Sequence, residues 1–377
     1  MSWPEPARTR MPEAITAIDE GVTAASVRLG ARALGTTWPN PAVGAIIARD
    51  GIVLARGRTG PGGKPHGEVL ALAAAGGAAR GATLYVSLEP SAHHGRTPPC
   101  SEAIVAAGIG RVVAPLGDAD PRVAGRGFAG LRAAGLQVAT GACEALARRA
   151  HAGHFMRVRA GRPWVMLKLA VSADGGIGLT GEGRVAVTGE IARRHVQALR
   201  GRFDAILVGR GTVEADDPEL TCRLPGIEGR SPVRVVLDSE GRLPPGAKVL
   251  DPVAATPTWI VSAAADRRGI ADGERLRWLT VAAGEGGVNL AAALSAIAEL
   301  GITRVLAEGG ATLARGLLAA DLVDEAIIFR SPDALGEGRV PALGEMALET
   351  VTASARFRAT ERRRFGRDRM TRYERVG

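Results

Sequence analysis

Hydrophobic and polar positions in the first part of the chain follow helical spacing and strand spacing in turn. Residues 13–34 carry apolar side chains at helical intervals before Gly35, and residues 42–57 read as two strands joined by an Asp50-Gly51 turn. Further helices are expected in 68–76, 101–108, 127–135 and 144–158, and further strands in 82–90, 111–118 and 136–141. This alternation predicts an α/β sheet with helical crossovers.

A second alternating series follows a boundary at residues 159–163. Strands are expected in 163–172, 204–211, 233–239, 258–263, 304–310 and 324–332, and helices in 190–201, 289–301 and 311–320. A chain of 377 residues is also too long for one ordinary core. The pattern therefore predicts two α/β domains in tandem.

Composition limits where the protein works. Hydrophobic residues make up 46% of the chain, but no apolar run approaches the roughly 18 residues that a membrane span requires. The first residues lack the apolar core of a signal peptide, and the three cysteines are too widely spaced for a disulfide framework. We expect a cytoplasmic protein with no membrane partner, and paired domains of this type favour a homo-oligomer, a dimer or a tetramer.

The net charge of +9 is concentrated at one end of the chain. Residues 356–377 hold nine arginines and only three acidic residues. Residues 369–376 alternate side chains as a strand does, and the chain has few aromatic residues to stack on bases. A solvated edge strand is favoured over a nucleic-acid surface, so no nucleic-acid partner is expected.

His66, Glu68 and Cys100 form the first candidate site. His66 and Glu68 stand at the start of one expected helix, and Cys100 opens the next, where free backbone N–H groups favour a thiolate. An H-x-E sequence followed by a Pro-Cys pair is the signature of zinc deaminases. In that chemistry zinc lowers the pKa of water to about 7, and Glu68 would carry the proton.

The motifs "TWPNPAVGAII", "PHGEV", "LEPSAHHGRTPPC" and "DPRVAGRGFAGLRAAG" resemble the deaminase domain of the bifunctional riboflavin biosynthesis proteins, over residues 13–157. The resemblance implies a cytidine-deaminase-like three-layer fold and one Zn²⁺, with Glu68 as the catalytic proton carrier. The implied zinc ligands are His66, Cys100 and the residue at position 91. The implied substrate contacts are Asn40, His93, His94 and Arg96.

Position 91 departs from the family, which has cysteine where this chain has Ser91. A serine hydroxyl is a poor neutral zinc ligand. Three alternatives remain open: zinc bound weakly through His66, Cys100 and water, a substitute ligand at His93 or His94, or an inactive deaminase.

Three strand ends in the second domain carry chemistry. Lys168, Ser172 and Asp174 belong to the first, and a loop with Thr212, Asp216, Asp217 and Arg223 belongs to the second. At the third, Glu308 leads Gly309 and Gly310 into a helix whose N–H groups suit a phosphate. Such ends meet at one sheet edge, which predicts a binding cleft. The G-x-G-x-x-G run at Gly125 has no strand before it, so we interpret it as a loop.

These second-domain motifs resemble the reductase domain of the same family, over residues 162–377. The resemblance implies a dihydrofolate-reductase-like α/β fold and hydride transfer from NADPH to the ribose of the deaminated pyrimidine. The implied cofactor contacts are Ala170, Thr212, Asp216, Ser239, Gly310, Ala311, Thr312, Leu313, Ala314, Arg315 and Gly316. The implied substrate contacts are Lys168, Arg200, Leu220, Arg223 and Glu308. A reductase alone, a nucleic-acid base deaminase and a binding protein are the alternatives.

Overall fold

The computed structural model describes residues 14–94, 98–183, 185–251, 256–265 and 273–376. The chain divides into two compact units, Met1–Arg159 and Ala160–Gly377. No helix in the described ranges is long and apolar enough to cross a membrane.

The first unit is built on a five-stranded sheet in the order β2-β1-β3-β4-β5. Its strands are β1 (Gly44–Arg49), β2 (Ile52–Arg58), β3 (Thr83–Val86), β4 (Arg111–Ala114) and β5 (Gln137–Thr140). Strand β1 runs antiparallel to both neighbours, whereas β3, β4 and β5 are parallel. Asp50 and Gly51, both with positive φ, turn β1 into β2 as predicted.

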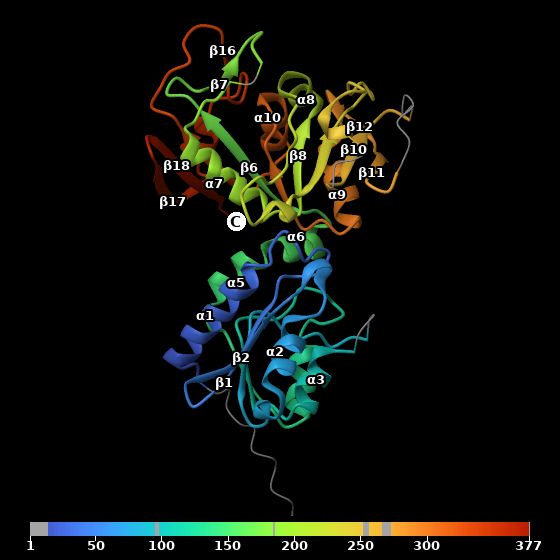
Figure 1. The fold of residues 1–377 in the computed structure, drawn as a ribbon, viewed down its shortest axis with the longest axis vertical. Coiled ribbons are helices and arrows are strands. Elements are labelled where there is room, and N and C mark those ends of the chain that lie inside the picture. Colours follow the sequence, from blue (N-terminus) through green and yellow to red (C-terminus); the bar gives the residue numbers. More distant parts are fainter. Residues whose placement is uncertain (1–13, 95–97, 184, 252–255, 266–272, 377) are drawn as a thin grey trace, which may run out of the picture. The chain divides into compact units, whose positions relative to one another are not determined.

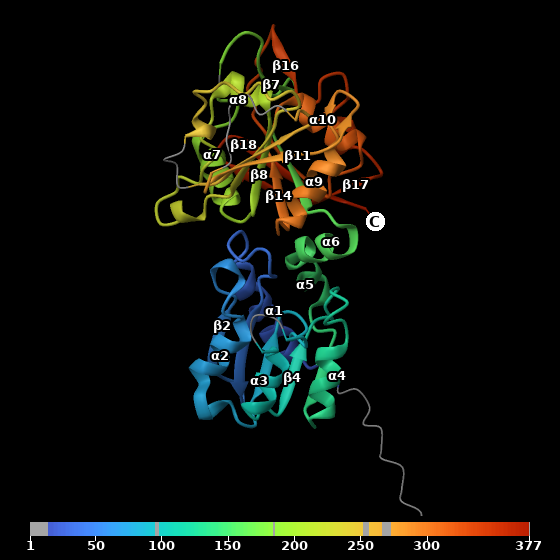
Figure 2. The ribbon, with the colours of Figure 1, turned by 90° about the vertical axis from the view of Figure 1, so that its right-hand side faces the viewer.

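Helices cover both faces of this sheet. They are α1 (Ala17–Ala31), α2 (Gly67–Ala75), α3 (Cys100–Ala106), α4 (Arg126–Ala133), α5 (Glu144–Ala150) and α6 (Ala152–Ala160). Helices α1 and α5 lie on one side, and α2, α3 and α4 on the other (Figures 1 and 2). Alternate residues of β1 enter the two cores, since Ile46 and Ala48 pack in one cluster and Ala45 and Ile47 in the other. The expected three-layer fold is confirmed.

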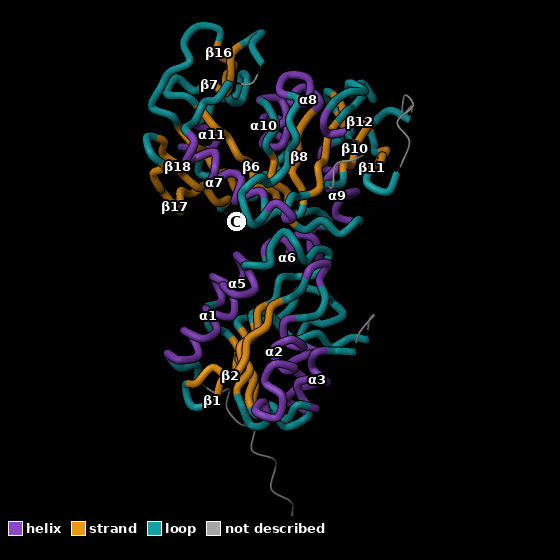
Figure 3. The backbone as a smooth tube through the Cα atoms, in the orientation of Figure 1, coloured by secondary structure: helices purple, strands orange, loops and turns teal. Residues whose placement is uncertain are grey.

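The second unit contains a nine-stranded sheet, in the order β11-β10-β9-β8-β14-β6-β15-β18-β17 (Figure 3). Its strands are β6 (Trp164–Val171), β8 (Ala205–Gly209), β9 (Val233–Leu237), β10 (Thr258–Ser262), β11 (Leu276–Thr280), β14 (Arg304–Ala307), β15 (Glu325–Arg330), β17 (Phe357–Phe365) and β18 (Asp368–Arg375). All pairs up to β15 are parallel, and β17 and β18 form an antiparallel edge. Two small sheets add β7 (Gly176–Leu179) with β16 (Arg339–Pro341) and β12 (Ala283–Gly284) with β13 (Gly287–Val288).

The helices of the second unit connect these parallel strands. They are α7 (Glu190–Arg200), α8 (Arg210–Asp216), α9 (Leu290–Glu299), α10 (Ala311–Ala319) and the short α11 (Glu349–Thr352). Helix α7 packs on the antiparallel edge, where the rings of His195 and Phe365 lie 4.5 Å apart. The arginine-rich terminus forms the β17–β18 hairpin, so the expected edge strand is present.

Two local predictions were wrong. Thr212 and Asp216 were expected in a loop but lie on α8, which starts after the extended Gly209 and ends where Asp217 adopts positive φ. Residues 144–158 were expected as one helix, but His151 separates α5 from α6. In both places one turn of backbone geometry, which residue spacing does not reveal, decides the element.

Candidate active sites

The first site is assembled by two helix starts and a loop. His66 is the N-cap of α2, Glu68 lies in its first turn, and Cys100 is the first residue of α3. A side chain at Gly67 would come within 2.6 Å of the Val43 carbonyl oxygen, so α2 starts directly against the sheet. The fold thus brings together residues 34 positions apart, with His66 Nδ1 3.1 Å from Cys100 Sγ.

The donor atoms of His66, Glu68 and Cys100 suit a divalent metal ion. One atom from each lies within 4.8 Å of the others. Glu68 Oε2 is buried and has no hydrogen-bond partner among the described residues, a costly arrangement unless a ligand or an ion completes it. Imidazole, thiolate and carboxylate are all zinc donors, so the residues fit the expected metal.

Burial controls the protonation of this site. It raises the pKa of Glu68, and the nearby positive charge of His66 only partly offsets it. Burial and the Glu68 carboxylate raise the pKa of the Cys100 thiol, although hydrogen bonding from Ser91 acts in the other direction. The expected stabilisation of a Cys100 thiolate by helix N–H groups is therefore outweighed by burial, and the thiolate depends on a cation beside it.

The remaining residues expected at this site are spread around it. Ser91 Oγ accepts a hydrogen bond from the Cys100 backbone N–H at 3.0 Å. His94 is exposed and faces Glu102, with Nε2 3.5 Å from Oε1, whereas His93 Nδ1 is buried without a described partner. Neither histidine joins the group of metal donors in the described residues. Asn40 donates to the Gly63 carbonyl at 3.1 Å, and Arg96 lies outside the described residues.

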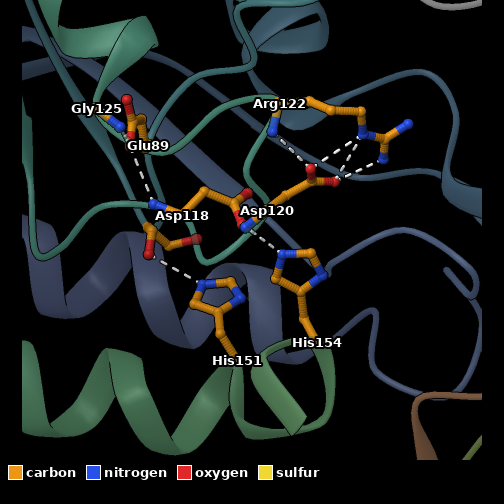
Figure 4. A network of polar contacts seen from close by, with 8 residues as sticks. Glu89, Asp118, Asp120, Arg122, Gly125, His151 and His154 are labelled. Carbon is orange, nitrogen blue, oxygen red and sulfur yellow. Dashed lines mark hydrogen bonds and ion pairs between the residues drawn. The ribbon is translucent and has the colours of Figure 1, made fainter. Parts of the chain in front are cut away.

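A buried acidic residue supports the loop that carries Ser91 (Figure 4). Glu89 accepts hydrogen bonds from the backbone N–H groups of Asp118, Gly125 and Phe128 at 3.0 to 3.2 Å. Asp118 in turn pairs with His154 at 2.6 Å. The sequence analysis missed Glu89, although a carboxylate directly after a buried strand was a usable signal.

The glycine-rich run after this loop packs against it, as the sequence suggested. Gly125 is the N-cap of α4 with a φ of 78°, and a side chain at Gly127 would come within 2.1 Å of the Pro90 carbonyl oxygen. The run follows a loop rather than a strand, so it forms no dinucleotide fingerprint.

The second site is a cavity of about 1100 Å³ at the carboxyl ends of four neighbouring strands. Strands β9, β8, β14 and β6 are adjacent and parallel, so Ser239, Thr212, Glu308 and Lys168 converge there. The cavity is lined by every residue expected to contact cofactor or substrate except Ala314, which is buried in α10.

An ion pair forms the floor of this cavity. Arg200 Nε and Nη2 lie 2.8 and 3.0 Å from the two oxygens of Glu308, and Lys168 Nζ lies 3.9 Å from Oε2. Burial raises the pKa of Glu308, but the charge and hydrogen bonds of Arg200 outweigh it, so the pKa lies below its usual range. The carboxylate is thereby kept ionised beside two cations.

The start of α10 borders the same cavity. Thr212 Oγ1 accepts a hydrogen bond from the Gly310 N–H at 3.1 Å, and Gly310, the N-cap, brings no side chain to the helix start. The following N–H groups are suited to a phosphate. Ser239 Oγ accepts from the Val288 N–H at 3.0 Å and so fixes the β13 edge.

Other cavity residues were missed or misplaced by the sequence analysis. Arg210, Lys248 and Gly286 also line the cavity; Arg210 directly follows β8, a usable signal. Ser172 and Asp174 do not line it, because Asp174 accepts the N–H groups of Leu335 and Gly336 instead.

Comparison with known proteins agrees with both sites. Residues 17–116 match the family described as "Cytidine and deoxycytidylate deaminase zinc-binding region", and residues 163–370 match "RibD C-terminal domain". The riboflavin biosynthesis protein RibD of Escherichia coli K12 is 37% identical over 93% of this chain and 97% of its own length. RibD of Aquifex aeolicus is 36% identical over 94% of this chain and 98% of its own.

Solved structures give the same result. Acinetobacter baumannii RibD matches with a TM-score of 0.85 and 35% identity, over 96% of this chain and 99% of that one. A Thermotoga maritima protein, titled a diaminohydroxyphosphoribosylaminopyrimidine deaminase and 5-amino-6-(5-phosphoribosylamino)uracil reductase, matches with 0.83 and 28% identity, over 95% and 99%. The chain therefore belongs to the RibD family of riboflavin biosynthesis proteins, in which a zinc-binding deaminase domain precedes a reductase domain.

Proposed function

We propose that this chain catalyses two consecutive steps on one phosphorylated pyrimidine. Residues 13–157 would hydrolytically deaminate 2,5-diamino-6-(5-phosphoribosylamino)pyrimidin-4-one, and residues 162–377 would reduce the ribosyl group of the product to ribityl with NADPH. The names of the Thermotoga reactions support this substrate. The observation that carries the deaminase half is the gathering of His66, Glu68 and Cys100.

In the deaminase half, Glu68 is the proposed catalytic residue. When bound, zinc supplies Lewis acidity that makes water a nucleophile at neutral pH, and His66 and Cys100 would hold it. Glu68, buried and with one unpaired oxygen, accepts a proton from the attacking water and returns it to the leaving amine. Asn40, His93, His94 and Arg96 are the proposed substrate contacts.

In the reductase half, positioning does most of the work. Lys168, Arg200 and Arg223 would hold the substrate phosphate and ring, and the Glu308 carboxylate fixes the direction of Arg200. Thr212, Asp216, Ser239 and residues 310–316 would hold NADPH, with its phosphates at the start of α10. Hydride transfer then needs proximity and orientation rather than an acid or base.

A pair of variants separates the two activities. Glu68→Gln should abolish ammonia release from the diamino substrate but leave NADPH oxidation with the deaminated substrate unchanged. Glu308→Gln should do the opposite. If both variants lose both activities, or if neither substrate supports NADPH oxidation by the natural chain, the proposal is wrong.

The setting of the enzyme is also proposed. We expect it in the cytoplasm, since its proposed coreactant NADPH is a cytoplasmic reductant, and as a dimer or tetramer. Sedimentation of the purified chain would give one species of two or four subunits, and a monomer at working concentration would contradict this.

A further inference from the structure

Ser91 is fixed beside Cys100 by two hydrogen bonds. Its hydroxyl oxygen accepts the Cys100 N–H at 3.0 Å, and its backbone carbonyl accepts the Ser101 N–H at 3.1 Å. The N-cap of α3 is Pro99, whose side chain makes no capping bond, so Ser91 performs that task. The side-chain oxygen therefore has a defined place next to one residue of the metal-binding group.

We infer that Ser91 supplies the third protein donor of this metal site, through its hydroxyl oxygen. This inference rests on the proposed function. A hydroxyl has two lone pairs, and the Cys100 N–H occupies one of them. The site then combines one imidazole nitrogen from His66, one thiolate from Cys100 and one hydroxyl oxygen.

The competing donors are placed less favourably. His94 is directed toward Glu102, and His93 does not join the donor group in the described part of the chain. Glu68 does belong to that group, but a ligating carboxylate could no longer carry the proton. Ser91 is the one candidate that adds a donor and leaves Glu68 free for catalysis.

An oxygen in place of a second thiolate changes the metal preference. A hydroxyl is a harder and weaker donor than a thiolate, so the site should hold zinc less tightly and discriminate less against metals that prefer oxygen. Changes even in residues that only support metal ligands alter affinity by about 10- to 100-fold, and a ligand change should match or exceed this.

The test is a metal titration of the full chain and three variants. We expect Ser91→Cys to bind zinc at least about 10-fold more tightly and Ser91→Ala about 10-fold more weakly than the natural chain. With cobalt(II), the thiolate charge-transfer absorption should double in Ser91→Cys and stay unchanged per bound ion in Ser91→Ala. Ser101→Ala, changed at the adjacent residue, is the matched control and should bind as the natural chain does.

Two outcomes would overturn the assignment. Equal affinity of Ser91→Ala and the natural chain would show that the hydroxyl is no donor, and an unchanged cobalt absorption in Ser91→Cys would place position 91 outside the coordination sphere. Thermal unfolding and NADPH oxidation with the deaminated substrate report whether each variant folds. Because metal affinity is read without turnover, an expected affinity series in an inactive deaminase would contradict the proposed function and not the ligand assignment.

Discussion

Arg200 and Glu308, 108 positions apart in the chain, form a two-pronged ion pair at 2.8 and 3.0 Å on the floor of the second cavity. Both side chains are largely buried, at 12% and 7% exposure, so neither charge is solvated if the other is lost. This pair connects the stability of the second unit to its substrate site, because Lys168 shares the same carboxylate.

Replacing Glu308 by Gln should therefore destabilise the second unit as well as impair reduction. Breaking a buried pair from one side costs about 3–5 kcal/mol, since the remaining charge stays buried. Chemical denaturation measures this change. Glu144→Gln removes an exposed pair with Arg148 in the first unit and should cost less than about 1 kcal/mol. Equal effects of the two variants would contradict the prediction.

A methyl group added at Gly127 should destabilise the first unit. The new Cβ would lie 2.1 Å from the Pro90 carbonyl oxygen, so Gly127→Ala forces the loop beside Ser91 to move. We expect a loss of about 1–3 kcal/mol and weaker zinc binding. On the same helix, Gly130→Ala meets no atom within 4 Å and should stabilise by up to about 1 kcal/mol. Similar losses in both variants would mean that the Pro90 contact is not the cause.

Acid should weaken the first unit through Asp19. Burial raises the pKa of Asp19, but its bonds to Arg111 and Thr16 lower it far more, so the folded-state pKa lies below the unfolded one. The stability from this group is complete above the ordinary aspartate pKa of about 3.9 and is lost as pH falls below it. Unfolding midpoints at neutral and acid pH should converge in Asp19→Asn. Asp50→Asn, in an exposed turn, should keep the natural pH dependence.

Thr212→Val should weaken NADPH binding. The substitution removes the hydroxyl that accepts the Gly310 N–H, which leaves the start of α10 less well fixed. We expect the dissociation constant for NADPH to rise about 10-fold, in keeping with the loss of about 1.4 kcal/mol from one buried hydrogen bond. Fluorescence titration measures it. Thr180→Val, exposed at the end of β7 and outside the cavity lining, should have no effect.

Sequence reasoning succeeded where a local rule decides the structure. The Asp50-Gly51 turn is set by two residues, and Cys100 at a helix start follows from the break that the preceding prolines make. It failed where one turn of backbone is decisive, as at His151 between α5 and α6.

The sites show the same division. His66 and Cys100 were paired by their motif, although no periodicity places them 3.1 Å apart. Arg210 and Glu89 were missed because their positions depend on which strands become neighbours, and Asp174 was misassigned because its carboxylate is used by the turn at Leu335.

The account's central claim is that one chain carries out both reactions. The most direct test is to start zinc-loaded natural protein on the diamino substrate and measure ammonia and NADPH together. The account predicts equal amounts of ammonia released and NADPH oxidised, with ammonia appearing first. NADPH oxidation with the deaminated substrate, combined with no ammonia release from the diamino substrate, would contradict it.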